Sequence, residues 1–262
     1  MPVVERHIVT DLIRIVDNQT PIMIMVGPSN CGKSMVAHRM FAWLVKRGYS
    51  VDVDRKLYVN GNHQNTEIFD LVSQTPSLST QHLVLYKITK NGNPVLQVLD
   101  SPGREWFDYN NDSFGRVLSV QVYQMINCSN KKIWIYFTEP EWEQSAERKS
   151  YVKTIQHIKM ISSKRDRHIV MLNKVDRDAS LNPQGHVLMV KGMGIERFLD
   201  LQYPGLLKLF SNNCFFSKWY RKYCCNILPF MTGDYQQKAD GRIVYSLGPD
   251  VYPETMWKYI MK

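Results

Sequence analysis

The chain has 262 residues, of which 44% are hydrophobic and 22% are charged. This balance is typical of a globular protein and excludes a disordered chain or a coiled coil. No apolar run reaches the ~18–20 residues that a membrane span needs, and the first residues lack the pattern of a signal peptide. We therefore expect one domain, residues 1–262, in the cytoplasm.

Lysine and arginine exceed aspartate and glutamate by 33 to 24, which gives a net charge of +9. This excess favours an anionic partner such as a nucleotide, a nucleic acid or an acidic membrane face, but it does not choose among them. The five cysteines are an odd number and contain no Cys-x-x-Cys pair. They are expected to be free thiols in a reducing compartment and not a disulfide framework or a zinc site.

The first half of the chain predicts a strand, a loop, a helix and then a hairpin. An amphipathic pattern predicts a leading helix over residues 4–16, within a leading segment 1–20. A continuous apolar run at 22–26 predicts a strand covered on both faces, and a helix follows over 35–46. After a polar stretch, strands at 83–88 and 95–99 flank an Asn-Gly step, which is typical of a β-hairpin.

The second half continues the alternation of strands and helices. Strands are predicted at 132–138 and 168–172 with a helix over 141–161 between them, and a helix over 194–210 leads to a last strand at 214–217. Residues 218–252 predict an irregular insertion before a closing helix at 253–260. The expected fold is α/β, with a mostly parallel sheet of about six strands, one antiparallel hairpin strand and helices on both faces.

Residues 27–34 match the pattern G-x-x-x-x-G-K-[ST] between the first strand and its helix. This form lets backbone N–H groups and a helix N-terminus surround phosphates, while the lysine reaches the terminal phosphates and the serine hydroxyl reaches Mg²⁺. A chance glycine- and serine-rich turn is the alternative, and the strand and helix on either side favour phosphate binding. The loop consists of Gly27, Pro28, Ser29, Asn30, Cys31, Gly32, Lys33 and Ser34.

Two further motifs follow predicted strands. Asp100 to Gly103 form D-x-x-G after the strand at 95–99, where the carboxylate can hold Mg²⁺ through water and the glycine amide can reach a γ-phosphate. Asn173 to Asp176 form N-K-x-D after the strand at 168–172, where the carboxylate can accept two hydrogen bonds that guanine offers and adenine does not. Each motif alone is more typical of an ordinary turn, but their order along the chain favours a nucleotide site.

With these three motifs in this order, residues 22–217 resemble the P-loop GTPases of the translation-factor and Ras-like type, strongly in the motifs and weakly between them. The closing helix also resembles the ending of some bacterial GTPase-like proteins. The resemblance implies a P-loop NTPase G domain that binds GTP or GDP with Mg²⁺. Lys33 would bind the β- and γ-phosphates, Ser34 and Asp100 would serve Mg²⁺, and Gly103 would sense the γ-phosphate, while Asn173, Lys174 and Asp176 would frame the guanine.

Two elements of that family are less clearly matched. The threonine that coordinates Mg²⁺ in the triphosphate state should precede residue 83, where Thr75 and Thr80 both qualify; Thr80 is taken as the metal ligand. The last guanine-contacting motif is assigned to Ser217, with Ser246 as its rival.

One departure from the family concerns hydrolysis. Ras-like enzymes have a water-orienting glutamine directly after the D-x-x-G glycine, whereas this chain has Arg104 and then Glu105. Arginine has donors and no acceptor, so Arg104 cannot act as a base, although it could stabilise transition-state charge or be a surface residue. Glu105 is the next candidate to position water. We therefore expect slow GTP hydrolysis unless a partner, or self-association through the loops at 60–80 and 103–113, supplies the missing group.

Two other functions fit parts of the sequence. Residues 46–54 resemble the second strand of P-loop small-molecule kinases, so an ATPase or a kinase is the first alternative. A scaffold that binds nucleotide without hydrolysis is the second, because Arg104 does not provide the usual chemistry. The basic aromatic segment 219–225 could also contact an acidic membrane or nucleic acid, although a basic surface element explains it more simply.

Overall fold

A computed structural model of the chain describes residues 17–53, 84–103, 106, 120–140, 142, 145–177, 193–212, 222–237 and 243–262. The predicted leading helix at 4–16 lies outside these residues, as do the polar stretch at 60–80 and the predicted strand at 214–217.

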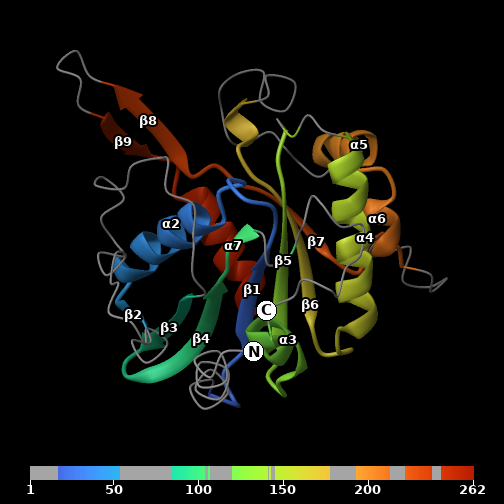
Figure 1. Cartoon of the computed structure of the whole chain (residues 1–262). Coiled ribbons are helices and arrows are strands. Elements are labelled where there is room, and N and C mark those ends of the chain that lie inside the picture. The colour runs from blue at the N-terminus through green and yellow to red at the C-terminus, as the bar shows by residue number, and fades with distance from the viewer. Residues whose placement is uncertain are drawn as a thin grey trace, which may run out of the picture.

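The core of the molecule is a seven-stranded sheet with the order β2-β3-β4-β1-β5-β6-β7 (Figure 1). Six of its strands point in the same direction: β4, β1, β5, β6 and β7, which pair in parallel, and β2 at the edge beyond β3. The strands are β1 (Ile22–Val26), β2 (Tyr49–Val53), β3 (Val84–Lys90), β4 (Asn93–Asp100), β5 (Lys132–Thr138), β6 (Arg167–Leu172) and β7 (Asn226–Pro229).

One strand, β3, is antiparallel to both of its neighbours, β2 and β4. The turn between β3 and β4 has Asn91 at φ 52° and Gly92 at φ 78°, the left-handed conformations that a tight hairpin requires. The predicted hairpin is confirmed, and so is the fold class of a mostly parallel α/β sheet. The sheet has one strand more than the approximate prediction.

Helices cover both faces of the sheet. In the sheet, β2 lies on one side of β1, and β6 lies on the opposite side of β5. Because connections between parallel strands are right-handed, the helix between β1 and β2 and the helix between β5 and β6 lie on opposite faces. Figure 1 shows α2 and α7 on one side and α4, α5 and α6 on the other, and α2 contacts α7. The helices are α2 (Lys33–Val45), α3 (Val120–Asn127), α4 (Ser145–Ile161), α5 (Met193–Gln202), α6 (Leu206–Leu209) and α7 (Val251–Met261).

The region after residue 218 differs from the prediction. Where an irregular insertion was expected, the structure has β7 and a separate hairpin of β8 (Gly233–Gln237) and β9 (Ile243–Leu247). β7 pairs with β6 and so completes the main sheet. It is only four residues long and ends at a proline, so its apolar pattern is too short to be recognised in the sequence.

The centre of the sheet is the most deeply buried part. Every residue of β1 and β5 is buried, including Trp134, Tyr136 and Phe137 of β5. Tyr151 of α4 donates a hydrogen bond to the Val26 carbonyl at 2.9 Å, which anchors α4 at the end of β1. The described residues include no helix long and apolar enough to cross a membrane.

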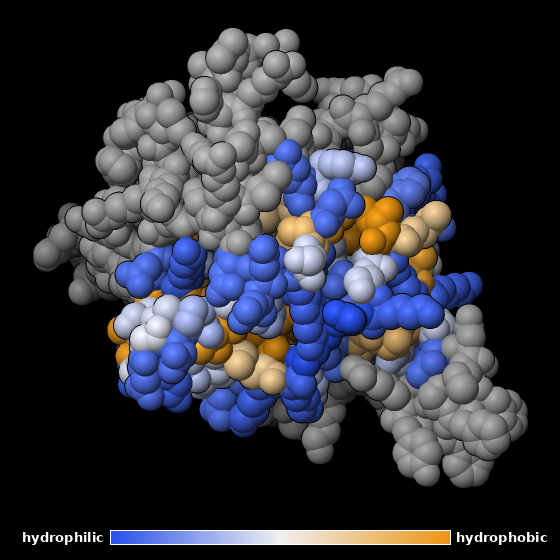
Figure 2. All heavy atoms as spheres, turned by 90° about the horizontal axis from the view of Figure 1, so that it is seen from below, coloured by the Kyte–Doolittle hydropathy of each residue, from blue (hydrophilic) through white to orange (hydrophobic). Residues whose placement is uncertain are grey.

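The edge at which the parallel strands begin is seen in Figure 2. Hydrophilic side chains cover much of the described surface there, with smaller apolar patches among them. A pocket of about 650 Å³ is lined by residues at the starts of β6 and β7 and the end of α7. His168 of β6 is one of its lining residues, and its Nδ1 lies 3.0 Å from the Tyr136 hydroxyl.

His168 should make the stability of the fold depend on pH. Burial lowers the pKa of His168 from 6.5 to about 4, because the charged imidazolium is poorly solvated there. The unfolded chain therefore binds this proton at higher pH than the folded chain, and the stability that neutral His168 contributes is lost as the pH falls from 6.5 to 4. Urea unfolding measures the free energy of unfolding at pH 7 and pH 5. Between these two pH values it should fall less for His168→Asn than for wild type, and an equal fall would show that His168 does not cause the pH dependence.

Candidate functional site

The predicted motifs lie at one edge of the sheet. Parallel strands end on the same side, so the segments that follow β1, β4, β5, β6 and β7 all meet there. The neighbouring strands β1 and β5 are connected to helices on opposite faces of the sheet, so the connections diverge at their ends. In open α/β sheets ligands bind at such a position.

The phosphate-loop candidate, residues 27–34, is closely packed and takes backbone conformations that favour particular residues. A Cβ on Gly27 would lie 2.8 Å from both Phe137 Cβ and Cys31 Sγ, so only glycine fits there. Asn30 and Gly32 have φ values of 63° and 86°, in the left-handed region. α2 begins directly after Gly32 and has no side-chain cap, so its N-terminal dipole faces the loop.

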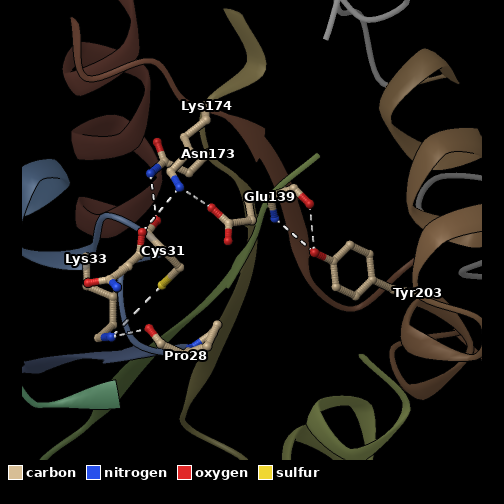
Figure 3. Close-up of polar contacts among 8 residues, drawn as sticks. Pro28, Cys31, Lys33, Glu139, Asn173, Lys174 and Tyr203 are labelled. Carbon is tan, nitrogen blue, oxygen red and sulfur yellow. Dashed lines mark hydrogen bonds and ion pairs between the residues drawn. The ribbon is translucent and has the colours of Figure 1, made fainter. Parts of the chain in front are cut away.

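Lys33 lies across the loop and is only 5% exposed. Its Nζ donates to the Gly27 carbonyl at 3.0 Å. It also donates to the Pro28 carbonyl at 2.8 Å (Figure 3). Replacing Lys33 would therefore remove two hydrogen bonds from the loop as well as a positive charge. Cys31 is fully buried beside it, and burial raises the pKa of the Cys31 thiol, so the thiol stays protonated.

Ser34 and Asp100 come together from different segments of the chain. Ser34 Oγ donates to Asp100 Oδ2 at 2.5 Å, and Asp100 is 2% exposed at the end of β4. Mg²⁺ prefers oxygen ligands and is held by one or two carboxylates, so this hydroxyl and carboxylate fit it. Larger groups of His, Cys, Asp or Glu that could hold a metal are absent from the described residues. Thr80, the third predicted ligand, lies outside them.

Gly103 lies directly against the phosphate loop. A Cβ there would be 2.1 Å from Ser29 N and 2.4 Å from the Pro28 carbonyl carbon. The same segment is anchored by buried Trp106, whose Nε1 donates to Ser101 Oγ at 2.5 Å and whose backbone N donates to the Gly103 carbonyl at 3.1 Å. Arg104 and Glu105, the candidates for hydrolysis, lie outside the described residues.

Asn173 joins the base-reading motif to the phosphate loop. Its Nδ2 donates to the Cys31 carbonyl at 2.9 Å, and its backbone N donates to the Thr138 carbonyl at 2.8 Å. Only 1% of Asn173 is exposed, and a Cβ on Gly32 would lie 2.5 Å from its Nδ2. Its Oδ1 is buried without a hydrogen-bond partner among the described residues. Such an acceptor is suited to a ligand donor.

Lys174 and Asp176 complete the base-reading motif. Lys174 has φ 56°, and its Nζ donates to the Asn30 carbonyl at 3.2 Å and forms an ion pair with Glu139. Asp176 is exposed on the 3-10 turn Val175–Arg177. Burial, with a smaller contribution from the Asp176 charge, raises the pKa of Tyr252 of α7 to about 12.

The sequence analysis missed two residues of this site, Glu139 and Tyr203. Glu139 follows β5 directly, and that position at the carboxyl edge of the sheet was the one signal that could have identified it. Tyr203 follows α5, and its hydroxyl hydrogen-bonds both backbone groups of Glu139. Nothing in the local sequence around residue 203 indicates that contact.

The assignment of the last guanine-contacting motif to Ser217, with Ser246 as its rival, stays a prediction. Ser217 lies outside the described residues, and its rival Ser246 lies on β9, opposite Asp234 of β8. The segment that reaches the site edge follows β7 instead: Phe230 N donates to the Leu172 carbonyl at 2.8 Å, and Val175 N donates to the Phe230 carbonyl at 3.4 Å. Phe230 is therefore next to the N-K-x-D motif.

Neither a protein-family model nor a curated protein sequence matches the chain. Among solved structures, the chain is similar to nucleolar GTP-binding protein 1 from Plasmodium falciparum, with 14% sequence identity and a TM-score of 0.40. That alignment covers 83% of this chain and 79% of the other. A likeness this distant carries no argument about function, which therefore depends on the contacts described above.

The close approach of Gly103 to the phosphate loop can be tested by adding one methyl group. Gly103→Ala should destabilise the protein by about 1–3 kcal/mol, because the new Cβ overlaps the backbone of the loop. Gly194→Ala is the matched control, since nothing lies within 4 Å of a Cβ at this exposed position of α5. Urea unfolding of nucleotide-free protein measures both, and equal midpoints for the two variants would show that residue 103 has room for a side chain.

Proposed function

We propose that the chain is a G domain that binds GTP and GDP with Mg²⁺, hydrolyses GTP slowly and changes its contacts with the nucleotide state. The observation that carries the proposal is the hydrogen bond from Asn173 Nδ2 to the Cys31 carbonyl at 2.9 Å. It joins a motif suited to a base with a loop suited to phosphates, so one ligand can contact both. A nucleoside phosphate has that combination of groups.

The phosphate side of the site uses Lys33, Ser34, Asp100 and Gly103. Lys33 would exchange its hydrogen bonds to the two loop carbonyls for hydrogen bonds to phosphate oxygens. The phosphate is negatively charged and the carbonyls are neutral, so the new bonds would be stronger. Ser34 and Asp100 would hold Mg²⁺, which neutralises part of the phosphate charge. Gly103, which touches Ser29 in the loop, would respond to the γ-phosphate through its backbone N–H.

The base side of the site uses Asn173, Lys174 and Asp176. The exposed Asp176 carboxylate is an acceptor for the two neighbouring N–H donors of guanine, and adenine has no matching pair. The buried Oδ1 of Asn173 offers a further acceptor. These two acceptors favour a guanine nucleotide over the ATPase and kinase alternatives.

The cytoplasmic location, protein partners and self-association remain predictions from the sequence. The basic net charge supports an anionic ligand, and a nucleotide satisfies that requirement without a membrane or nucleic acid.

Base selectivity is the first test of the proposal. Wild-type protein should bind GTP and GDP at least about tenfold more tightly than ATP, because a lost pair of hydrogen bonds to a carboxylate costs about 1.5–3 kcal/mol. Asp176→Asn should remove this preference, and Asp200→Asn, the same change at an exposed position of α5, should keep it. Isothermal titration with the three nucleotides measures the ratio. Equal affinity of wild type for ATP and GTP would favour the ATPase or kinase alternative.

Turnover is the second test. Without a partner, GTP hydrolysis should be on the order of 10⁻⁴ s⁻¹, since Arg104 cannot orient water as a glutamine does. If Arg104 stabilises transition-state charge, Arg104→Ala should lower the single-turnover rate by a factor approaching ~10³ with unchanged GTP affinity; if it is a surface residue, the rate should not change. Fast hydrolysis that survives the substitution would contradict both roles and direct attention to Glu105. A complete lack of hydrolysis would favour the scaffold alternative.

A further inference from the structure

Glu139 forms an ion pair with the lysine of the base-reading motif. Its Oε2 lies against Lys174 Nζ, and the two side chains are only 13% and 22% exposed (Figure 3). Lys174 Nζ also donates to the Asn30 carbonyl at 3.2 Å. The lysine side chain is thus stretched from residue 174 to the phosphate loop, with its ammonium held between a carboxylate and a carbonyl.

Glu139 is itself held at a fixed position. The Tyr203 hydroxyl accepts a hydrogen bond from Glu139 N at 3.0 Å and donates one to the Glu139 carbonyl at 2.8 Å. Tyr203 is fully buried and lies beside Trp142, with ring centroids 6.0 Å apart. Burial raises the pKa of the Tyr203 phenol, so it stays protonated and keeps its donor. The carboxylate therefore projects from a clamped segment of backbone.

Glu139 also compensates charge at the loop. Lys33 and Lys174 both donate hydrogen bonds to carbonyls of the phosphate loop, so two ammonium groups lie beside one loop, and Glu139 pairs with the second of them. Without Glu139, two ammonium groups would repel each other beside the phosphate loop.

We infer that Glu139 is a positioning residue, which holds Lys174 against the phosphate loop and so prepares the guanine-binding surface before nucleotide arrives. This inference rests on the proposed guanine-nucleotide function. A lysine side chain that is already ordered loses less conformational entropy when the base packs against it. Glu139 thereby increases affinity for the nucleoside part of the ligand and leaves phosphate binding to the loop itself.

Glu139→Gln tests this role because it keeps the size of the side chain and removes its charge. GTP and GDP affinities should both fall about tenfold, and Mg²⁺-pyrophosphate, which probes the phosphate loop alone, should bind as it does to wild type. The matched control is Glu196→Gln, which removes the charge from the ion pair with Lys222, away from the described site. Isothermal titration measures the affinities, and the melting temperature of nucleotide-free protein should not change.

A double-mutant cycle identifies Lys174 as the residue through which Glu139 acts. Lys174→Met should weaken GDP binding, and adding Glu139→Gln to that variant should cause no further loss. Unchanged GDP affinity of Glu139→Gln would overturn the inference. A lower melting temperature, or an equal loss of pyrophosphate binding, would also overturn it by showing a structural role. If wild type binds no guanine nucleotide, the proposed function itself is wrong and the inference fails with it.

Discussion

The contact between Asn173 and the Cys31 carbonyl is the interaction on which the geometry of the site depends. It connects the end of β6 to the loop that follows β1, across the intervening strand β5. The contact requires the loop backbone to approach the asparagine closely, and Gly32 allows this because a Cβ would lie 2.5 Å from Asn173 Nδ2. The same glycine has a φ of 86°, so two independent constraints exclude a side chain there.

Two other glycines of the motifs, Gly27 and Gly103, also allow a close approach between segments of the chain. Gly27 makes room for Phe137 of β5, and Gly103 makes room for the backbone of Ser29. Three segments that are distant in sequence are thus packed closely against one loop, through the side chains of Phe137 and Asn173 and through the backbone at Gly103. Movement of one of them must displace the others, because packed interiors do not deform continuously. A ligand that changes the position of Gly103 would therefore also affect the loop at 27–34.

The sequence predicted the parts of the fold whose patterns are local. The continuous apolar runs at 22–26 and 132–138 became the two fully buried central strands, and the Asn91-Gly92 step became the hairpin turn. The single helix predicted at 194–210 is two helices, since Gly205 takes a φ of 89° between them. β7 was missed because its place in the sheet comes from pairing with β6, and four residues carry no periodicity that could predict it.

The sequence predicted which motif segments lie together at one edge of the sheet, and the roles of their residues stay predictions; it missed residues whose contacts arise only in the tertiary structure. The motifs at 27–34, 100–103 and 173–176 follow strand ends, so topology alone brings them together. Glu139 also follows a strand, but its importance appears only when Lys174 and Tyr203, from two other segments, are found against it.

Under the proposed function, the charges at this edge would let a basic protein bind one anion selectively. Lys174 is paired with Glu139, and Asp100 is bonded to Ser34, whereas Lys33 is held by the carbonyls of Gly27 and Pro28. Carbonyl dipoles stabilise a buried ammonium less than a carboxylate does, so Lys33 retains unbalanced positive charge in a region with little water. The net charge of +9 attracts anions at long range, but salt screens that attraction within about 10 Å at 0.1 M ionic strength. Selectivity therefore has to come from the short-range contacts of the loop, where Lys33 is buried and screening is weak.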